Sequence, residues 1–243
     1  MKRYYYPKRD FSIPESLLTG YLSNVIGDRP SDDALFWEMW NECQSIADAV
    51  LQTDYFKGIV NANLHPAAFG SLMVQDAYYC MKGRDDYSAA VTHALDDKCK
   101  EFMQRKVDSY DNYNVYYHKT WHIREAQSII PGKEIKDYAD YEAYVAGNLE
   151  SPYVFCVMLP CEYLWNWVAN QIDDSVPAGT IYRFWVDSNR GEPTGGYQMA
   201  NILEDYRSQI NESKAKEIFK KAMNYELEVF TASTKIDKLW EKK

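Results

Sequence analysis

Apolar residues recur at helical spacing along almost the whole chain, and this pattern limits the possible folds more than any other feature of the sequence. In residues 31–52, for example, Leu35, Met39, Ile46 and Val50 fall close to one face of a helix. Runs in which apolar and polar residues alternate, as they do in a half-buried strand, are nearly absent. The chain is therefore predicted to be all-α, with no β-sheet.

The helical pattern shows no break that suggests two domains. The 243 residues contain no internal repeat and no low-complexity stretch, so we predict one domain over residues 1–243, with residues 1–30 as an N-terminal extension packed on it. Residues 108–134, rich in Tyr, Asn and Asp, are predicted to be a loop with one extra helical turn. The predicted helices cover residues 31–52, 66–83, 86–110, 135–147, 153–172, 179–188, 195–210 and 212–233.

Charge and cysteine content argue against several classes of protein. The net charge of −9, without a cluster of Lys and Arg, argues against nucleic-acid binding. No apolar run reaches the ~18 uncharged residues of a membrane span. The five cysteines are scattered and form no CxxC pair, which is typical of reduced thiols. We therefore expect a soluble, cytoplasmic protein with neither nucleic acid nor membrane as a partner.

A proline and a cysteine stand side by side in the long apolar segment of residues 153–172. Pro160 cannot donate a hydrogen bond to the carbonyl of Cys156, and a proline inside a helix costs about 3 kcal/mol relative to alanine. A bend near Cys161 is expected to open space and turn the thiol toward a cavity. Without a base or a cation nearby, the same thiol is only a small buried apolar residue.

Two carboxylates lie in predicted helices whose neighbouring residues are mostly apolar. Asp76 either faces solvent together with Gln75 or points into a pocket, where it would bind a ring nitrogen and an amino group. Of Glu226 and Glu228, one is expected to face water. The other would lie in an apolar environment, which raises the pKa of a carboxyl group and makes it a usable general acid.

The histidines are few, and they do not predict a metal site. His118 and His122 lie four residues apart, followed by Glu125, which would fit a metal ion if this segment were helical. However, the Glu-x-x-His pairs of di-iron helical bundles are absent, as are Gly-rich phosphate loops and GxSxG turns. The sequence therefore predicts neither a metal nor a cofactor.

Three segments, taken in order and at their separations, resemble the TenA family of thiaminase II and aminopyrimidine aminohydrolases. They are LMVQDAYYC, MLPCEYLW and MNYELEVF, and the stretch FKGIVNANLHPAAFGSLMVQD is also similar to the family pattern. The resemblance covers about residues 36–233. It implies a single-domain, haem-oxygenase-like helical bundle. It also implies a homo-oligomer, either a dimer or a tetramer, because relatives in the family form homo-oligomers.

The resemblance also implies roles for individual residues. Cys161 matches the family's nucleophile, and Glu226 matches the glutamate that delivers a proton to the leaving group. Asp76 matches the aspartate that contacts the aminopyrimidine ring. Aromatic residues implied to line the same pocket are Tyr79, Tyr138 and Phe230. Two positions differ from the family pattern, because Trp165 and Asn189 stand where pocket tyrosines are usual.

From this resemblance we expect an enzyme of thiamin salvage that hydrolyses thiamin or thiamin-derived aminopyrimidines, such as aminomethylpyrimidine to hydroxymethylpyrimidine. The alternative is a diverged TenA-like protein that binds another small ligand with little or no hydrolysis. Trp165 and Asn189 favour this alternative. A haem oxygenase is a third possibility, but residues 33–52 contain no histidine to bind the iron.

Overall fold

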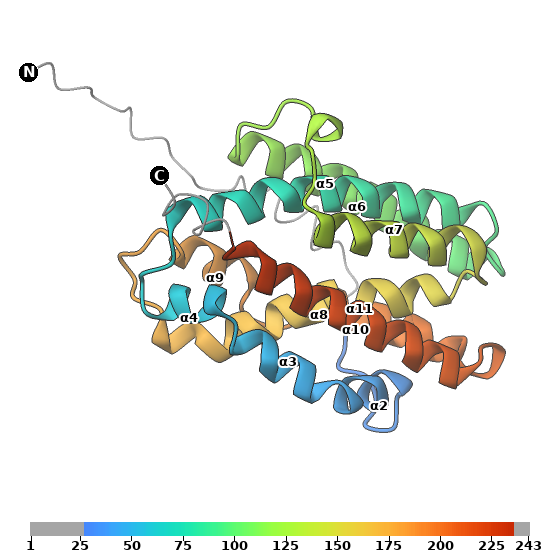
Figure 1. The fold of residues 1–243 in the computed structure, drawn as a ribbon. Coiled ribbons are helices and arrows are strands. Elements are labelled where there is room, and N and C mark those ends of the chain that lie inside the picture. The colour runs from blue at the N-terminus through green and yellow to red at the C-terminus, as the bar shows by residue number, and fades with distance from the viewer. Residues whose placement is uncertain (1–26, 236–243) are drawn as a thin grey trace, which may run out of the picture.

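The computed structural model describes residues 27–235, and within this range it is helical without any strand. Long helices form the body of the molecule (Figure 1). In chain order the α-helices are α2 (Leu35–Glu42), α3 (Gln44–Leu51), α4 (Asp54–Val60), α5 (Pro66–Val91), α6 (Asp97–Thr120), α7 (Lys133–Asn148), α8 (Tyr153–Ile172), α9 (Arg183–Asn189), α10 (Thr194–Asp205) and α11 (Glu212–Ser233). Short 3-10 helices η1 (Ala126–Ser128), η2 (Asp173–Ser175) and η3 (Arg207–Gln209) follow α6, α8 and α10.

Local sequence signals fix where several of these helices begin. Thr53, Asp96 and Asn211 each accept a hydrogen bond from a backbone N–H in the first turn of α4, α6 and α11. At the start of α5 the ring of His65 plays the same role, and Pro66 occupies the first helical position, where its missing N–H costs nothing. These caps satisfy backbone donors that would otherwise lack partners.

The helices pack in two groups around α8. Helices α5, α6 and α7 lie side by side, and α11 packs against α3, α7 and α8 (Figure 1). In α8 every residue from Tyr153 to Pro160 is buried, so this helix is the centre of the core. It continues as one helix through Pro160. Each functional candidate on α5, α7 or α11 can therefore approach α8.

Several predicted boundaries are wrong. Residues 31–52 contain two helices, α2 and α3, the predicted helix of residues 86–110 is divided between α5 and α6, and α4 was not predicted. α5 does not stop at Gly83 but continues to Val91, because this glycine permits close packing: a Cβ atom there would lie 3.1 Å from the ring of Tyr110 on α6. Residues 108–120 are helical instead of forming a loop. In that stretch Asn114 and Tyr117 are buried and bond backbone carbonyls of α5, namely those of Cys80 and Met73.

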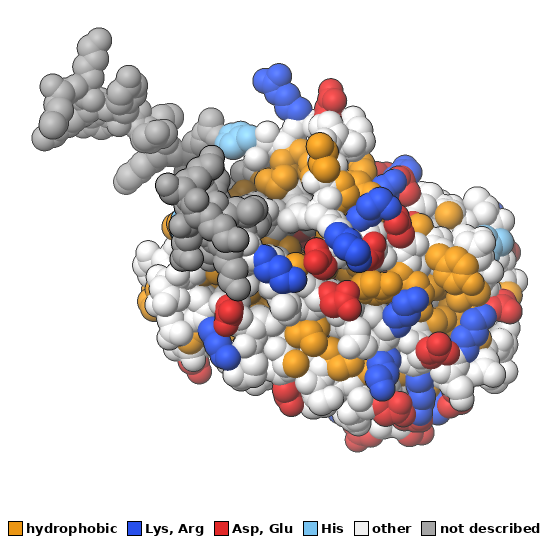
Figure 2. All heavy atoms as spheres, viewed as in Figure 1, with side chains coloured by type: hydrophobic (Ala, Val, Ile, Leu, Met, Phe, Trp, Pro, Cys, Tyr) orange, Lys and Arg blue, Asp and Glu red, His pale blue; other side chains and the backbone are white. Residues whose placement is uncertain are grey.

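The predicted N-terminal extension, residues 1–30, lies mostly outside the described residues. The part that is described contacts α10, since Asn201 donates a hydrogen bond of 2.8 Å to the carbonyl of Asp28. No helix within residues 27–235 is both long enough and apolar enough to cross a membrane. On the face shown in Figure 2, acidic and basic side chains are interspersed.

Candidate active site

The buried face of α5 carries the first component of the site. Asp76 is 4% exposed, so of the two predicted orientations its carboxyl group has the inward one, whereas Gln75 is only partly buried. Burial raises the pKa of Asp76 to about 6, and the Tyr117 hydroxyl and the Cys80 thiol partly offset this effect. The carboxyl group is therefore poised to gain or lose a proton near neutral pH.

Helix α11 contributes the second carboxyl group. Glu226 is 2% exposed, while Glu228 faces solvent. The indole Nε1 of Trp165 donates a hydrogen bond of 3.1 Å to Oε2 of Glu226. Burial raises the pKa of Glu226 to about 7, the Trp165 hydrogen bond lowers it, and the charge of Asp76 raises it further. Two buried carboxyl groups on different helices thus influence each other.

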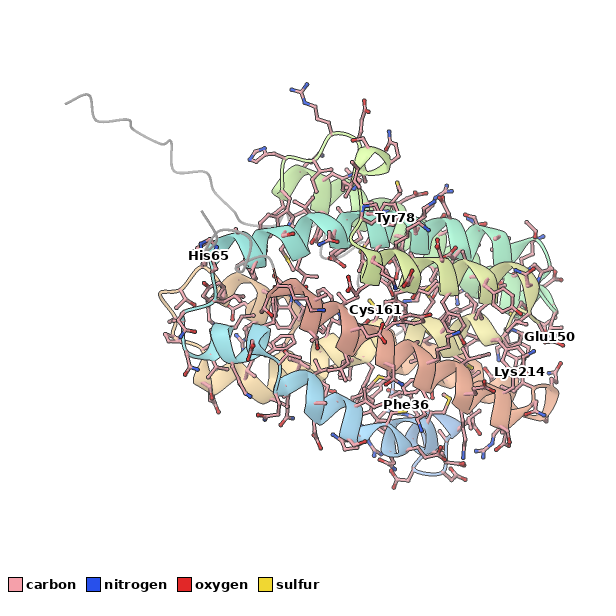
Figure 3. The ribbon with its side chains drawn as sticks, viewed as in Figure 1. Phe36, His65, Tyr78, Glu150, Cys161 and Lys214 are labelled. Atoms are coloured by element: carbon pink, nitrogen blue, oxygen red, sulfur yellow. The ribbon has the colours of Figure 1, made fainter. Side chains whose placement is uncertain are left out.

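The thiol lies on α8, immediately after its buried half. Cys161 and Trp165, one turn apart, are both only partly buried, although residues 153–160 are buried throughout. Figure 3 places Cys161 in the middle of the bundle. Burial raises the pKa of the Cys161 thiol well above its ordinary value, and the charges of Glu226, Asp76 and Glu142 add to this in that order. The thiol is therefore protonated in the free protein.

Aromatic side chains from α5 and α7 form one wall. The rings of Tyr79 and Tyr138 lie 5.1 Å apart, and Tyr138 stacks on Tyr225 at 5.6 Å. The hydroxyl of Tyr79 donates a hydrogen bond of 2.5 Å to Oε1 of Glu142, a residue with no exposed surface. Burial raises the pKa of Glu142 well above its ordinary value, and the hydrogen bond from Tyr79 partly offsets this effect.

A second aromatic wall surrounds Glu226 from the other side. Phe230, one turn after Glu226, lies 5.5 Å from the ring of Trp165 and 5.7 Å from that of Tyr55 on α4. Trp185 on α9 lies 5.7 Å from Trp165. Rings and carboxyl groups from different helices thus surround Cys161, a combination of side chains suited to a flat, nitrogen-containing ring.

The structure brings all but one of the predicted site residues into this cluster. The exception is Asn189, whose side-chain amide donates a hydrogen bond of 2.8 Å to the carbonyl of Trp185 on its own helix. Its backbone carbonyl accepts a bond from Asn166. Trp165, in contrast, directly contacts Glu226. The residues brought together are Asp76, Tyr79, Tyr138, Cys161, Trp165, Glu226 and Phe230.

The sequence prediction missed Glu142 and Tyr55. Glu142 shares the buried face of α7 with Ile135, Ala139 and Val145, so the spacing of these apolar residues was the signal that could have found it. No comparable signal marks Tyr55, because an aromatic residue in an apolar helix is ordinary core.

A surface groove of about 850 Å³ lies beside the cluster, between α5, the η1 region, the start of α7 and the end of α11. Three residues of its wall are each one helical turn from a cluster residue. The groove therefore adjoins the cluster, but Asp76, Glu226 and Cys161 are not among its lining residues. The three pairs are Leu72 with Asp76, Ile135 with Tyr138, and Val229 with Glu226.

A histidine metal site is not formed by the described residues. α6 ends at Thr120, so His122 lies beyond the helix that carries His118 and has a positive φ of 55°. Within residues 27–235, no three His, Cys, Asp or Glu side chains are grouped so that they would hold a metal ion.

Solved structures with the same architecture are TenA proteins. A TenA family transcription regulator from Silicibacter sp. has a TM-score of 0.72 at 13% identity, covering 82% of this chain and 96% of its own. A TenA homologue from Pyrococcus furiosus has a TM-score of 0.71 at 14% identity, covering 82% of this chain and 99% of its own. A protein from Sulfolobus solfataricus that is proposed to be a TenA-like thiaminase has a TM-score of 0.63 at 14% identity, covering 82% of this chain and 94% of its own.

Over residues 27–235 the chain is thus a single all-α helical bundle. Its fold is that of the TenA proteins, which confirms the resemblance predicted from the sequence at the level of the fold. No family model matches the sequence, and no curated protein matches it.

Proposed function

We propose that the chain is a TenA-like hydrolase that acts on thiamin or on thiamin-derived aminopyrimidines, with Cys161 as the nucleophile. The observation that carries this proposal is the meeting of a partly accessible thiol with two buried carboxyl groups. Burial brings the pKa values of these carboxyl groups to about 6 and about 7. Groups that titrate near the working pH are the most effective acids and bases.

The three groups suit displacement at a carbon attached to a pyrimidine ring. Protonated Asp76 gives its proton to a ring nitrogen, which makes the ring carbon electrophilic. The Glu226 carboxylate accepts the thiol proton as Sγ of Cys161 bonds to that carbon. Glu226 then delivers the proton to the departing amine as the bond between the exocyclic methylene and nitrogen breaks.

The second half of the reaction reverses these transfers. Glu226 removes a proton from water as the water oxygen bonds to the methylene. When Sγ leaves the ring carbon, Glu226 returns this proton to the thiolate and Asp76 recovers the proton of the ring nitrogen. The net change is replacement of an amine by a hydroxyl group, with every protein group restored.

A binding protein with little hydrolysis is the second candidate, and Trp165 is the observation that favours it. An indole is only a donor, so its bond to Glu226 stabilises the carboxylate and opposes proton donation by this residue. A tyrosine hydroxyl at this position would both donate and accept. Asn189, turned back on its own helix, supplies no replacement hydroxyl.

Incubation of the purified protein with aminomethylpyrimidine, and separately with thiamin, distinguishes the two candidates. We expect release of the pyrimidine alcohol from at least one substrate, detected by liquid chromatography. Saturable binding of the pyrimidine without release would favour the binding protein. If the protein shows neither binding nor release with either compound, the proposed hydrolase is contradicted.

A further inference from the structure

Tyr55 on α4 has a buried hydroxyl group that the fold does not use. Its side chain has no exposed surface, and within residues 27–235 its hydroxyl has no hydrogen-bond partner. Burying a hydroxyl without a partner is unfavourable, so such a group calls for an explanation. Among the described residues the buried hydroxyl of Tyr138 also has no partner, whereas the hydroxyl of Tyr206 donates a 2.5 Å bond to Asp96.

The surroundings of Tyr55 connect it to the candidate active site. Its ring contacts Phe230, which in turn contacts Trp165, the donor to Glu226. Among nearby charges, Asp76 contributes most to raising the pKa of the Tyr55 hydroxyl, after burial itself. The ring of Tyr55 is therefore part of the cluster through Phe230, and its unpartnered hydroxyl is within electrostatic reach of Asp76, the carboxyl group that is expected to bind the polar edge of the ligand.

We propose that Tyr55 is a specificity-determining residue whose hydroxyl exchanges a hydrogen bond with the same polar edge of a ligand ring that Asp76 binds. This inference rests on the proposed function and adds a residue to it. The ligand class is a planar heteroaromatic amine, in which a ring nitrogen and an exocyclic amino group lie on adjacent positions. The amino group donates to the phenol oxygen, and the ring nitrogen faces Asp76.

This assignment accounts for the loss of hydroxyls elsewhere in the site. Trp165 and Asn189 provide no phenol at their positions, and Asn189 is directed away from the cluster. Tyr55 provides a phenol from a different helix, α4, through the ring contact with Phe230. The protein would thus distinguish between ligands at the edge of the ring that carries the amino group.

The test compares Tyr55→Phe with the wild type in two measurements. In the absence of ligand, the melting temperature should stay the same or rise, because an unpaired hydroxyl is removed. In calorimetric titrations, binding of 4-amino-5-hydroxymethyl-2-methylpyrimidine should weaken about tenfold. Binding of the analogue without the amino group should change much less.

Tyr206→Phe is the matched control. It also removes a buried tyrosine hydroxyl, but this hydroxyl donates a hydrogen bond to Asp96, which is not a residue of the cluster. It should lower the melting temperature and leave ligand binding unchanged. Unchanged binding of the amino ligand by Tyr55→Phe, equal weakening for both ligands, or a clear loss of stability would overturn the proposal. If the wild type does not bind the pyrimidine at all, the proposed function falls, and the role of Tyr55 falls with it.

Discussion

The hydrogen bond from Trp165 to Glu226 can be removed without removing an aromatic ring, by the substitution Trp165→Phe. The folded state holds the pKa of Glu226 at about 7, above its ordinary value of 4.5. The contribution of this group to stability is therefore fully present below pH 4.5 and is lost as the pH rises through 7. The indole N–H limits this loss because it bonds the charged form.

The size of the effect follows from the charge of the acceptor. A hydrogen bond to a charged group contributes about 1.5–3 kcal/mol, so its removal should raise the pKa of Glu226 by roughly 1–2 units. Relative to wild type, Trp165→Phe should lose about 2 kcal/mol more at about pH 8.5 than at about pH 5.5. For a chain of this length that corresponds to an additional drop of roughly 4–8 °C in melting temperature.

Trp185→Phe is the matched control. Its ring lies 5.7 Å from that of Trp165, but its indole nitrogen is buried without a hydrogen-bond partner in the described part of the chain. Thermal unfolding of both variants, followed by circular dichroism across this pH range, makes the comparison. If the two substitutions have the same pH dependence, the Trp165–Glu226 bond does not control the ionisation of Glu226.

Two further predictions concern buried carboxyl groups whose pKa is raised by burial. Glu142→Gln should retain nearly wild-type stability at pH 7, because the amide oxygen can still accept the hydrogen bond from Tyr79. Glu142→Leu leaves the Tyr79 hydroxyl unpaired and should lose about 1–3 kcal/mol of stability in urea unfolding. Equal losses in the two variants would show that the ionised form of Glu142 is needed. Burial raises the pKa of Asp86 to about 8 from 3.8, so stability should fall as the pH rises through this range. Asp86→Asn should flatten this dependence by a few kcal/mol, and an unchanged slope would contradict the burial of an ionisable Asp86.

The fold was largely predictable because helical spacing is a local property of the sequence. Residues 153–172 and 212–233 were predicted with the bounds that α8 and α11 have. The failures occur where tertiary contacts decide. Asn and Tyr in residues 108–120 indicate a loop by composition, yet Asn114 and Tyr117 are helical because carbonyls of α5 accept their hydrogen bonds.

The site was predictable only where the sequence matches a motif. Asp76, Cys161 and Glu226 stand in three such segments, and each is found in the cluster. Asn189 was included because the family resemblance puts it where a pocket tyrosine is usual. The direction of its side chain, however, depends on a hydrogen bond to the carbonyl of Trp185. Tyr55 could not be found at all, because whether a phenol hydroxyl has a partner is decided by neighbours distant in the sequence.

Replacement of Cys161 by serine tests the nucleophile most directly, with Cys156→Ser as the control one turn earlier, where the thiol is fully buried in the core. The measurement is the rate of pyrimidine alcohol release together with the melting temperature of each variant. We predict that Cys161→Ser loses more than ~100-fold in turnover and keeps its stability, because a hydroxyl is far less ionised than a thiol. Cys156→Ser should lose stability and, while folded, retain turnover. Full hydrolysis by Cys161→Ser would contradict nucleophilic catalysis at this residue.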